Sequence, residues 1–449
     1  MSDRVCIIGA GACGLTSAKT LAEHDIPFDC FEIGSGIGGN WRYGNDNGRS
    51  AAYDSLRIDT SKDRMAFSDF PMPEEYPNYL HHSQVLEYFE AYAERFALDE
   101  RITFRTRVVR VEPSDAEAGY RVRTESLEDG TVREEIYRAV LVANGHHWSP
   151  RLPELPGRFD GTMLHSRDYR RPDGLEGQNV LVLGIGNSGV DIACDVAPVA
   201  AKTFLSSRRS AHVVPRRLLG RPTDKWTSPL TSRLPLAVQR AFYSLLLLVG
   251  RGRQERYGLP KPPTPLLTEH PTLSSHLLPL VAEGEVIPKP AVERLDGSEI
   301  VFADGTRERI DTFVCATGYR IRFPFLDREI LAAEENRVPL YGRVVHPEHP
   351  GLYFIGLIQP LGAIMPLAEL QARWVARLLT GATRLPDTDS MWRWIEADRR
   401  ELAERYVDSP RHTIQVDFFP YERWLERQMR RPAARPNAAT RAANRRRSA

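Results

Sequence analysis

The chain has 449 residues and a hydrophobic content of 42%, enough for two or three globular domains with buried cores. Its 60 basic residues are balanced by 59 acidic ones, so no net field is available to hold nucleic acid or an anionic membrane. The five cysteines lack CxxC spacing, which argues against a disulfide framework, a zinc site or a dithiol redox centre. No metal site is expected.

Targeting and membrane signals are weak along the chain. No secretion-signal pattern precedes the first apolar strand. The longest apolar run, residues 241–250, is about half the ~20 residues that a membrane-spanning helix needs. We therefore expect a buried or interfacial helix at that run, no integral membrane anchor, and a cytoplasmic protein.

A glycine-rich motif follows the first apolar strand. Residues 4–8 read as a buried parallel strand that continues into Gly9-Ala-Gly11-Ala-Cys-Gly14 and a helical pattern. The first glycine allows a tight turn, the second lets a pyrophosphate approach, and the third lets helix and strand pack closely. The next strand ends at Glu32, where a carboxylate accepts hydrogen bonds from a ribose 2′-OH. This order predicts a dinucleotide site.

The pattern recurs in the middle of the chain. A strand over residues 179–183 precedes Gly184-Ile-Gly186-Asn-Ser188-Gly189, and the following strand ends in Ser206-Ser207-Arg208-Arg209 instead of an acid. A guanidinium binds the 2′-phosphate that a carboxylate would repel, so this second site should prefer NADPH to NADH. The alternative is a pair of solvated surface arginines. Two such motifs in one chain indicate FAD at the first and NADPH at the second, rather than two bound nicotinamides.

Two further stretches are described by composition. The proline-bearing stretch 221–279 is expected to form a helical excursion near the cleft, which either lines substrate access or covers hydrophobic surface. Residues 431–449, rich in arginine and alanine, are expected to be disordered. A basic end of this kind could attract RNA or acidic lipid, but we favour a merely solubilising role.

The segment between the two glycine motifs, FDGTMLHSRDY, contains no nucleophile or metal site. Together with those motifs it resembles the flavin-containing monooxygenase family, among the class B flavin-dependent monooxygenases. The family fingerprint FxGxxxHxxx(Y/F) is matched at Phe159, Gly161, His165 and Tyr169. The resemblance implies that this segment connects the FAD and NADPH domains near the nicotinamide site, with His165 among the cofactor-binding residues.

Other short stretches resemble the family in the same order along the chain. They are GGNW at residues 38–41, ATGY at 316–319, and QPLGA at 359–363 followed by ELQARW. The resemblance implies cofactor contacts by Gly39, Asn40, Trp41, Thr60, Thr317 and Gln359, in addition to Gly184, Gly186, Ser188, Gly189, Ser207, Arg208 and Arg209 of the second motif.

The chain departs from the family pattern at Asp59, where members usually carry an asparagine close to the flavin. The sister group of Baeyer–Villiger monooxygenases often has an aspartate in that neighbourhood, but its fingerprint usually ends in Trp followed by Pro or Asp, not in Tyr169-Arg170. We therefore favour oxygenation of a heteroatom and keep ketone oxygenation open. The alternative for Asp59 is a helix or turn cap beside Thr60 and Ser61.

The resemblance also implies the reaction. NADPH reduces FAD, the reduced flavin captures O₂ as a C4a-(hydro)peroxyflavin, and a soft sulfur or nitrogen of a small molecule takes the distal oxygen. Asp59 is the catalytic candidate because a nearby carboxylate could tune that proton or orient NADP⁺. The expected partners are a small-molecule substrate and O₂, without nucleic acid, and a homo-oligomer is left open.

Other functions remain as alternatives. A pyridine nucleotide-disulfide reductase needs a redox cysteine pair, and none is spaced for it. A non-catalytic flavoprotein would bind both nucleotides and form no product. An uncoupled NADPH oxidase would consume NADPH and release hydrogen peroxide without an oxygenated product.

The expected fold is α/β with two doubly wound, Rossmann-like domains, the NADPH domain being inserted into the FAD domain. We expect the FAD domain over residues 1–170 and 310–430, and the NADPH domain over 171–309.

Overall fold

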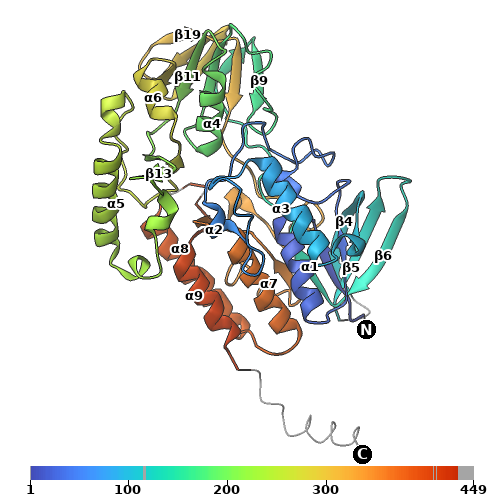
Figure 1. Cartoon of the computed structure of the whole chain (residues 1–449). Coiled ribbons are helices and arrows are strands. Elements are labelled where there is room, and N and C mark those ends of the chain that lie inside the picture. Colours follow the sequence, from blue (N-terminus) through green and yellow to red (C-terminus); the bar gives the residue numbers. More distant parts are fainter. Residues whose placement is uncertain (1, 115–117, 408, 411, 433–449) are drawn as a thin grey trace, which may run out of the picture.

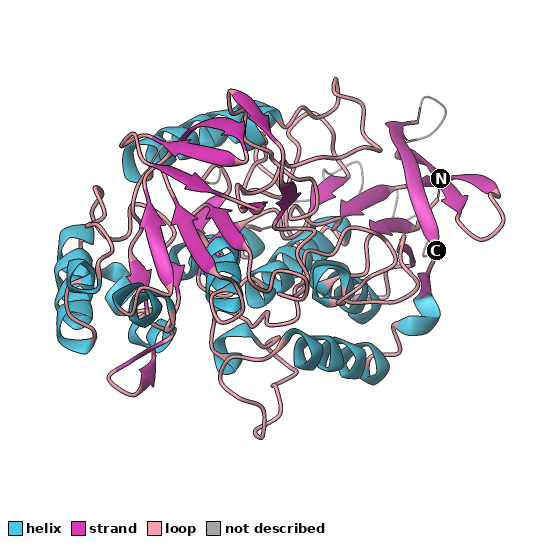
Figure 2. Ribbon diagram, turned by 90° about the horizontal axis from the view of Figure 1, so that it is seen from above, coloured by secondary structure: helices cyan, strands magenta, loops and turns pink. Residues whose placement is uncertain are grey.

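The computed structural model describes residues 2–114, 118–407, 409–410 and 412–432. The expectation of disorder for 431–449 therefore lies, from residue 433 on, outside the described residues. Two groups of strands, each with helices beside it, make up the molecule (Figures 1 and 2). The predicted α/β class with two Rossmann-like units is confirmed.

The first unit is built on a parallel five-stranded sheet. Its order is β21 (Leu352–Phe354), β7 (Ala139–Val142), β1 (Val5–Ile8), β2 (Phe28–Phe31) and β3 (Ile102–Thr103). Helices α1 (Ala12–Glu23), α3 (His82–Arg95) and α7 (Met365–Leu379) cover one face, and the antiparallel sheet of β4 (Thr106–Pro113), β5 (Tyr120–Ser126) and β6 (Val132–Tyr137) lies on the other.

Strand β1 shows why this sheet needs a continuous apolar sequence. Side chains alternate between the two faces of a strand. Val5 and Ile7 accordingly lie in the core beneath α1 and α7, while Cys6 and Ile8 lie in the core shared with β4 and β5. All four residues are buried, so a polar residue on either face would sit in a core.

The second unit repeats this plan. Its parallel sheet has the order β16 (Val286–Lys289), β11 (Lys202–Ser206), β10 (Asn179–Leu183), β20 (Thr312–Cys315) and β9 (Thr162–His165). Helices α4 (Asn187–Val196) and α6 (Leu277–Ala282) cover one face, and the sheet of β19 (Arg307–Arg309), β18 (Glu299–Phe302), β17 (Val292–Gly297) and β8 (Gly157–Phe159) covers the other. Val180 and Val182 of β10 face the helices, and Leu181 and Leu183 face the second sheet.

Strands β8, β9 and β20 all lie outside the expected range 171–309. They belong to the sheets of the second unit because β9 pairs with β20, β20 pairs with β10, and β8 pairs with β17. The second unit thus extends on both sides beyond the boundaries at 170/171 and 309/310.

The two crossings between the units are hydrogen-bonded to each other. The Arg151 amide donates to the Gly318 carbonyl at 3.0 Å, and the Arg320 amide donates to the Ser149 carbonyl at 2.8 Å. Residues 149–151 and 318–320 therefore form a short antiparallel pair where the chain enters and leaves the second unit.

The excursion of the second unit carries the helix α5 (Leu236–Gly250) at the outer edge of the molecule (Figure 1). Around it lie β12 (Val213–Val214), β13 (Arg217–Leu218), β14 (Arg221–Pro222), η3 (Thr223–Trp226), η4 (Thr231–Arg233), η5 (Gln254–Tyr257) and β15 (Thr272–Leu273). Among the described residues, no helix has the length and apolar content needed to cross a membrane.

The C-terminal part returns to the first unit. It contains β22 (Gln359–Leu361), α8 (Thr388–Arg405), β23 (Gln415–Asp417) and α9 (Phe418–Met429). The remaining short elements are η1 (Gly39–Trp41), α2 (Lys62–Met65), η2 (Asp99–Arg101) and η6 (Glu334–Asn336). Pairing of β22 with β23 fixes the loop that follows Gln359 against the start of α9.

Candidate active site

The first glycine turn joins β1 to α1 with the geometry expected of a pyrophosphate-binding loop. Gly9 has a φ of +102°, and a Cβ on Gly14 would lie 1.8 Å from the Gly9 carbonyl oxygen. A Cβ on Gly11 would meet nothing closer than the Gly39 Cα, at 3.7 Å. Gly9 and Gly14 are therefore required by the fold itself, whereas Gly11 leaves space above the uncapped N-terminus of α1.

Glu32 is buried at the end of β2 and helps to hold this turn. Its Oε2 accepts a hydrogen bond from the Ala10 amide at 2.7 Å, and its Oε1 accepts one from the Gly34 amide at 2.8 Å. Glu32 also lines the main cavity, so it lies where a ribose would approach the loop.

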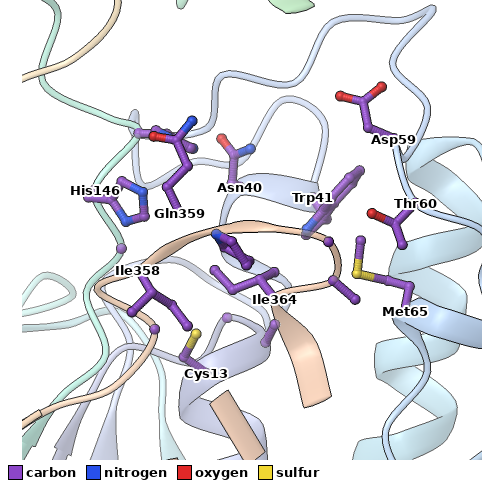
Figure 3. A pocket seen from close by; sticks show the side chains of 18 of the residues that line it. Cys13, Asn40, Trp41, Asp59, Thr60, Met65, His146, Ile358, Gln359 and Ile364 are labelled. Carbon is purple, nitrogen blue, oxygen red and sulfur yellow. The ribbon is translucent and has the colours of Figure 1, made fainter. Parts of the chain in front are cut away.

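One cavity of about 870 Å³ runs from the first glycine turn to the excursion of the second unit. Figure 3 shows Asn40 and Trp41 between His146 and Gln359 on one side and Asp59 and Thr60 on the other. Its expected lining residues are Gly9, Gly11, Glu32, Gly39, Asn40, Trp41, Asp59, Thr60 and Gln359. The cavity therefore brings together every residue expected at the FAD site except Gly14, which packs beneath the turn.

Asp59 lies at the junction of three segments. Its Oδ2 accepts a 2.6 Å hydrogen bond from the Asn187 side chain on α4, and its Oδ1 lies 3.2 Å from Nη2 of Arg216 in the excursion. Ser61, not Asp59, is the N-cap residue of α2. The side-chain contacts of Asp59 with Asn187 and Arg216 thus reach across the units, and the adjacent helix is capped by another residue.

Arg216 is shared between two carboxylates. Its Nη2 also lies 3.6 Å from Asp191 of α4, whose other contact is a 2.8 Å hydrogen bond from the Tyr53 hydroxyl. Burial, together with the charge of Asp191, raises the pKa of Asp59 to about 7, although Arg216 and Asn187 act in the opposite direction. Burial also raises the pKa of Asp191. Burial at this junction therefore favours the protonated forms of Asp59 and Asp191.

Sequence reasoning missed the partners of Asp59. Asn187 lies within the second glycine motif at a position that the motif leaves variable, and its Oδ1 accepts the Leu273 amide at 3.0 Å. Nothing in the local sequence marks Arg216 or Asp191 as neighbours of a residue more than a hundred positions away. These contacts depend on the packing of the two units.

The second glycine turn repeats the geometry of the first. Gly184 has a φ of +122°, Gly186 is the N-cap residue of α4, and a Cβ on Gly189 would lie 2.1 Å from the Gly184 carbonyl oxygen. These glycines and Ser188 do not line the main cavity, but their neighbour Asn187 does. The cavity thus touches the second turn at Asn187.

The arginines after β11 face solvent. Arg208 and Arg209 are exposed, and neither has a carboxylate partner within 4.0 Å among the described residues. Ser207 is held beside them by its amide, which donates to the Lys289 carbonyl at 3.2 Å. The two guanidinium groups are therefore free to meet an anion at the end of β11.

His165 and Thr317 lie outside the cavity lining. Nε2 of His165 bonds to the Gly318 carbonyl at 3.0 Å, and its Nδ1 accepts the Arg167 amide at 3.0 Å. The Thr317 hydroxyl donates to the Arg151 carbonyl. These hydrogen bonds link both side chains to the two crossings, and the cofactor contacts expected for His165 and Thr317 remain predictions.

The residues present fit a flavin dinucleotide. The facing glycines of the first turn and η1 leave a wall without side chains, the N-terminus of α1 offers N–H groups, and the adjoining cavity has the size of a cofactor and substrate site. Packing alone does not require a glycine at position 11, because a Cβ there would clash with no protein atom. Space for a bound pyrophosphate gives a reason for this glycine.

Comparison with known proteins gives a consistent result. Residues 2–439 match the family described as "Flavin-binding monooxygenase-like". The "Flavin-containing monooxygenase 5" of Rattus norvegicus is 42% identical over 432 residues, covering 92% of this chain and 80% of the relative. "Dimethylaniline monooxygenase [N-oxide-forming] 2" of the same species is 39% identical over 444 residues, covering 94% and 81%.

Solved structures share the fold. An S-allyl-L-cysteine S-oxygenase from Allium sativum superposes with a TM-score of 0.72 at 26% identity, covering 96% of this chain and 90% of that chain. A cyclohexanone monooxygenase in an open form gives a TM-score of 0.68 at 17% identity, covering 95% and 98%.

Proposed function

The chain belongs to the flavin-binding monooxygenase-like family and is an NADPH-dependent flavin monooxygenase, and we propose that it oxygenates a soft sulfur or nitrogen atom of a small molecule. The observation that supports this most directly is a continuous cavity that is lined by the first glycine turn, by Asp59 and by Asn187 of the second turn. A flavin held at the first turn and a nicotinamide reaching in from the second would meet there.

We assign the FAD site to the residues that line the cavity beside the first turn. Gly11 and the N-terminus of α1 would take the pyrophosphate, Glu32 a ribose, and Asn40, Trp41, Thr60 and Gln359 the remainder of the cofactor. When bound, FAD accepts hydride from NADPH and delivers the electrons to O₂, which supplies the transferred oxygen atom.

The NADPH site is assigned to the second turn. Gly184, Gly186, Ser188 and Gly189 approach the pyrophosphate, and Ser207, Arg208 and Arg209 hold the 2′-phosphate, which two unpaired guanidinium groups suit. Asn187 links this turn to Asp59. One hydrogen bond thus connects the second turn to the carboxyl group in the cavity.

We propose that Asp59 supplies and retains the proton that keeps the oxygen donor in its protonated form. A soft nucleophile takes oxygen from a protonated donor, whereas a ketone is attacked by a deprotonated one. A carboxyl whose pKa is raised to about 7 is still partly protonated near neutral pH and can donate that proton, which suits heteroatom oxygenation. Arg216 acts on Asp59 without lining the cavity and is a positioning residue.

The proposal also includes the domain boundaries and the cellular compartment. We divide the chain into a first unit of residues 1–156 and 320–432 and an inserted second unit from β8 to the second crossing, following the strand pairing. A reducing compartment such as the cytoplasm suits the five cysteines, which are all free thiols.

The test is the yield of oxygenated product per NADPH consumed by the FAD-loaded protein. A thioether, a tertiary amine and a cyclic ketone are compared, and hydrogen peroxide is measured in parallel. We expect near-stoichiometric product with the thioether or amine. Faster and better coupled turnover of the ketone would replace the proposal with ketone oxygenation, and peroxide as the main product with every acceptor would make the protein an NADPH oxidase.

A further inference from the structure

The segment FDGTMLHSRDY contains an arginine whose side chain reaches into the first unit. Nη2 of Arg167 donates to the Gly48 carbonyl at 2.7 Å, and its Nη1 donates to the Trp148 carbonyl at 3.2 Å. Its Nε lies 3.6 Å from the neighbouring Asp168 carboxylate, and its amide donates to Nδ1 of His165 at 3.0 Å. The two arms of the guanidinium therefore hold two separate segments of the first unit.

These two segments meet in a stacked pair of side chains. The guanidinium carbon of Arg49 lies 4.4 Å from the centroid of the Trp148 ring. Gly48 directly precedes Arg49 in the chain. Arg167 therefore bonds to the backbone beside one member of this pair and to the backbone of the other. One guanidinium thus fixes both halves of what we call the Arg49–Trp148 stack.

The Arg49–Trp148 stack belongs to the wall of the main cavity, close to Glu32. Arg49, Trp148 and Asn47 all line this cavity. Nδ2 of Asn47 donates to Oε1 of Glu32 at 3.4 Å, and its Oδ1 accepts the Arg49 amide at 2.8 Å. Because Glu32 is the residue assigned to a ribose, the stack is the neighbouring wall for the adenosine half of FAD.

The chemistry of Arg49 suits an adenosine group. Its side chain is half-buried and has no carboxylate within 4.0 Å among the described residues. Burial lowers the pKa of Arg49, and the charges of Arg107 and Arg167 act in the same direction, against that of Glu32. A guanidinium stacks on flat rings and also donates hydrogen bonds to hydroxyl and phosphate oxygens. Arg49 therefore has both the ring face and the donors that a nucleotide requires.

Arg170, which follows the same segment, holds the loop at two further points. Its Nη2 donates to the Ser50 carbonyl at 3.2 Å, and its own carbonyl accepts the Asp54 amide at 2.7 Å. The Ser50 hydroxyl in turn donates to the Asn40 carbonyl at 2.9 Å. The loop that carries Arg49 is thus tied both to the second unit and to a residue assigned to the flavin site.

We propose that Arg167 is a positioning residue for FAD, which sets the affinity for the adenosine half of the cofactor by fixing the Arg49–Trp148 stack. This role rests on the FAD site assigned under the proposed function. Arg167 does not line the cavity, so it acts on the cofactor through the stack alone. The role is distinct from the place near the nicotinamide that the family resemblance implies for this segment.

The experiment compares FAD binding by full-length variants. Arg167→Ala removes both carbonyl contacts, and Arg167→Lys keeps the charge but lacks the fork that reaches two carbonyls. The matched control is Arg377→Ala, because Arg377 also donates to a backbone carbonyl, that of Met429 at 3.1 Å, and lies outside the cavity lining. Equilibrium dialysis of the holoprotein gives the Kd for FAD. The KM for NADPH and the Tm are measured at saturating FAD.

We expect Arg167→Ala to raise the Kd for FAD by about 10–100-fold, since two hydrogen bonds from a charged donor are lost. Arg167→Lys should give an intermediate value, and the KM for NADPH should stay within about twofold of the wild type. Because Arg167 acts through the stack, Arg49→Ala/Arg167→Ala should weaken FAD binding by less than the product of the two single effects. A purely structural link would lower the Tm without this non-additivity.

Several results would overturn the role of Arg167. They are an unchanged Kd for FAD in Arg167→Ala, an equal rise in Arg377→Ala, and independent effects of the Arg49 and Arg167 substitutions. A raised KM for NADPH with an unchanged Kd for FAD would assign Arg167 to the nicotinamide side instead. Gly11→Ala tests the FAD site separately: if it retains its flavin, the site assignment fails, and if it alone loses flavin, only the role of Arg167 fails.

Discussion

Replacement of Asp59 by asparagine tests the charge cluster at the junction of the units. The side chain keeps its size and its ability to accept a hydrogen bond from Asn187, but it can no longer ionise. Arg216 remains paired with Asp191 at 3.6 Å. The substitution therefore isolates the effect of the Asp59 charge on stability.

The magnitude follows from the pKa. Burial raises the pKa of Asp59 from its usual 3.8 to about 7, so the folded chain holds this proton more tightly than the unfolded chain. The neutral carboxyl of Asp59 therefore adds to the free energy of unfolding. This contribution is complete below pH 3.8 and is lost as the pH rises toward 7. That interval corresponds to about 4 kcal/mol at ~1.36 kcal/mol per pH unit. Because the side chain is still 29% exposed, we take this value as an upper bound.

Thermal unfolding of the FAD-loaded protein near pH ~5.5 and ~8.5 provides the assay. We expect the Tm of Asp59→Asn, compared with the Tm of the wild type, to be higher at pH ~8.5 than at pH ~5.5. Asp63→Asn, which removes an exposed carboxylate from the neighbouring α2, should show no such difference. An equal effect of Asp59→Asn at both pH values, or a greater loss at the higher one, would refute a raised pKa for Asp59.

Three further predictions concern the nucleotide sites. Arg208→Ala/Arg209→Ala should raise the KM for NADPH by about 10–100-fold with little effect on NADH, because a charged pair with the 2′-phosphate is lost. Gly11→Ala should fold normally and lose flavin, whereas Gly14→Ala should fail to fold, since its Cβ would lie 1.8 Å from a carbonyl oxygen. His165→Ala should cost about 1–3 kcal/mol of stability, seen as a lower Tm, without changing the KM for NADPH.

Each of these three predictions has a result that would contradict it, and the arginine variant also has a matched control. Arg158→Ala removes an arginine with 89% of its side chain exposed and should leave both nicotinamide KM values unchanged. Equal effects on NADPH and NADH would remove Arg208 and Arg209 from the 2′-phosphate site. Full flavin content in Gly11→Ala would place the pyrophosphate elsewhere. A raised KM for NADPH in His165→Ala, with an unchanged Tm, would instead support the cofactor contact predicted for His165 from the sequence.

Local sequence was sufficient for the two glycine turns and for the strands that enter them. Gly14 and Gly189 are required by contacts only five residues away, with Gly9 and Gly184, so the motif itself contains the geometric reason for them. The outer strands were harder. The segment 162–165 has three partly or fully exposed residues, so it lacks the apolar pattern of a buried strand. Its partner β20 lies about 150 positions away, and hydrophobic periodicity does not predict such a distant pairing.

The candidate site was predictable to the extent that it follows the motifs. The lining residues beside the first turn were expected from the glycine pattern and the family resemblance. The partners of Asp59 were not, because Arg216 and Asp191 approach it from the second unit through tertiary packing alone. His165 had a clear sequence signature, and the structure adds its hydrogen bonds to the backbone of Gly318 and Arg167, which the signature did not predict.

The antiparallel pair formed by residues 149–151 and 318–320 places the entry and the exit of the second unit side by side. An insertion whose two ends are neighbours can be removed or exchanged as a cassette, because the host then needs to close only a short gap. The nucleotide preference of the second unit is thus separable, in evolution and in protein engineering, from the flavin site of the first. Two junctions, joined by backbone hydrogen bonds, are all that such an exchange has to preserve.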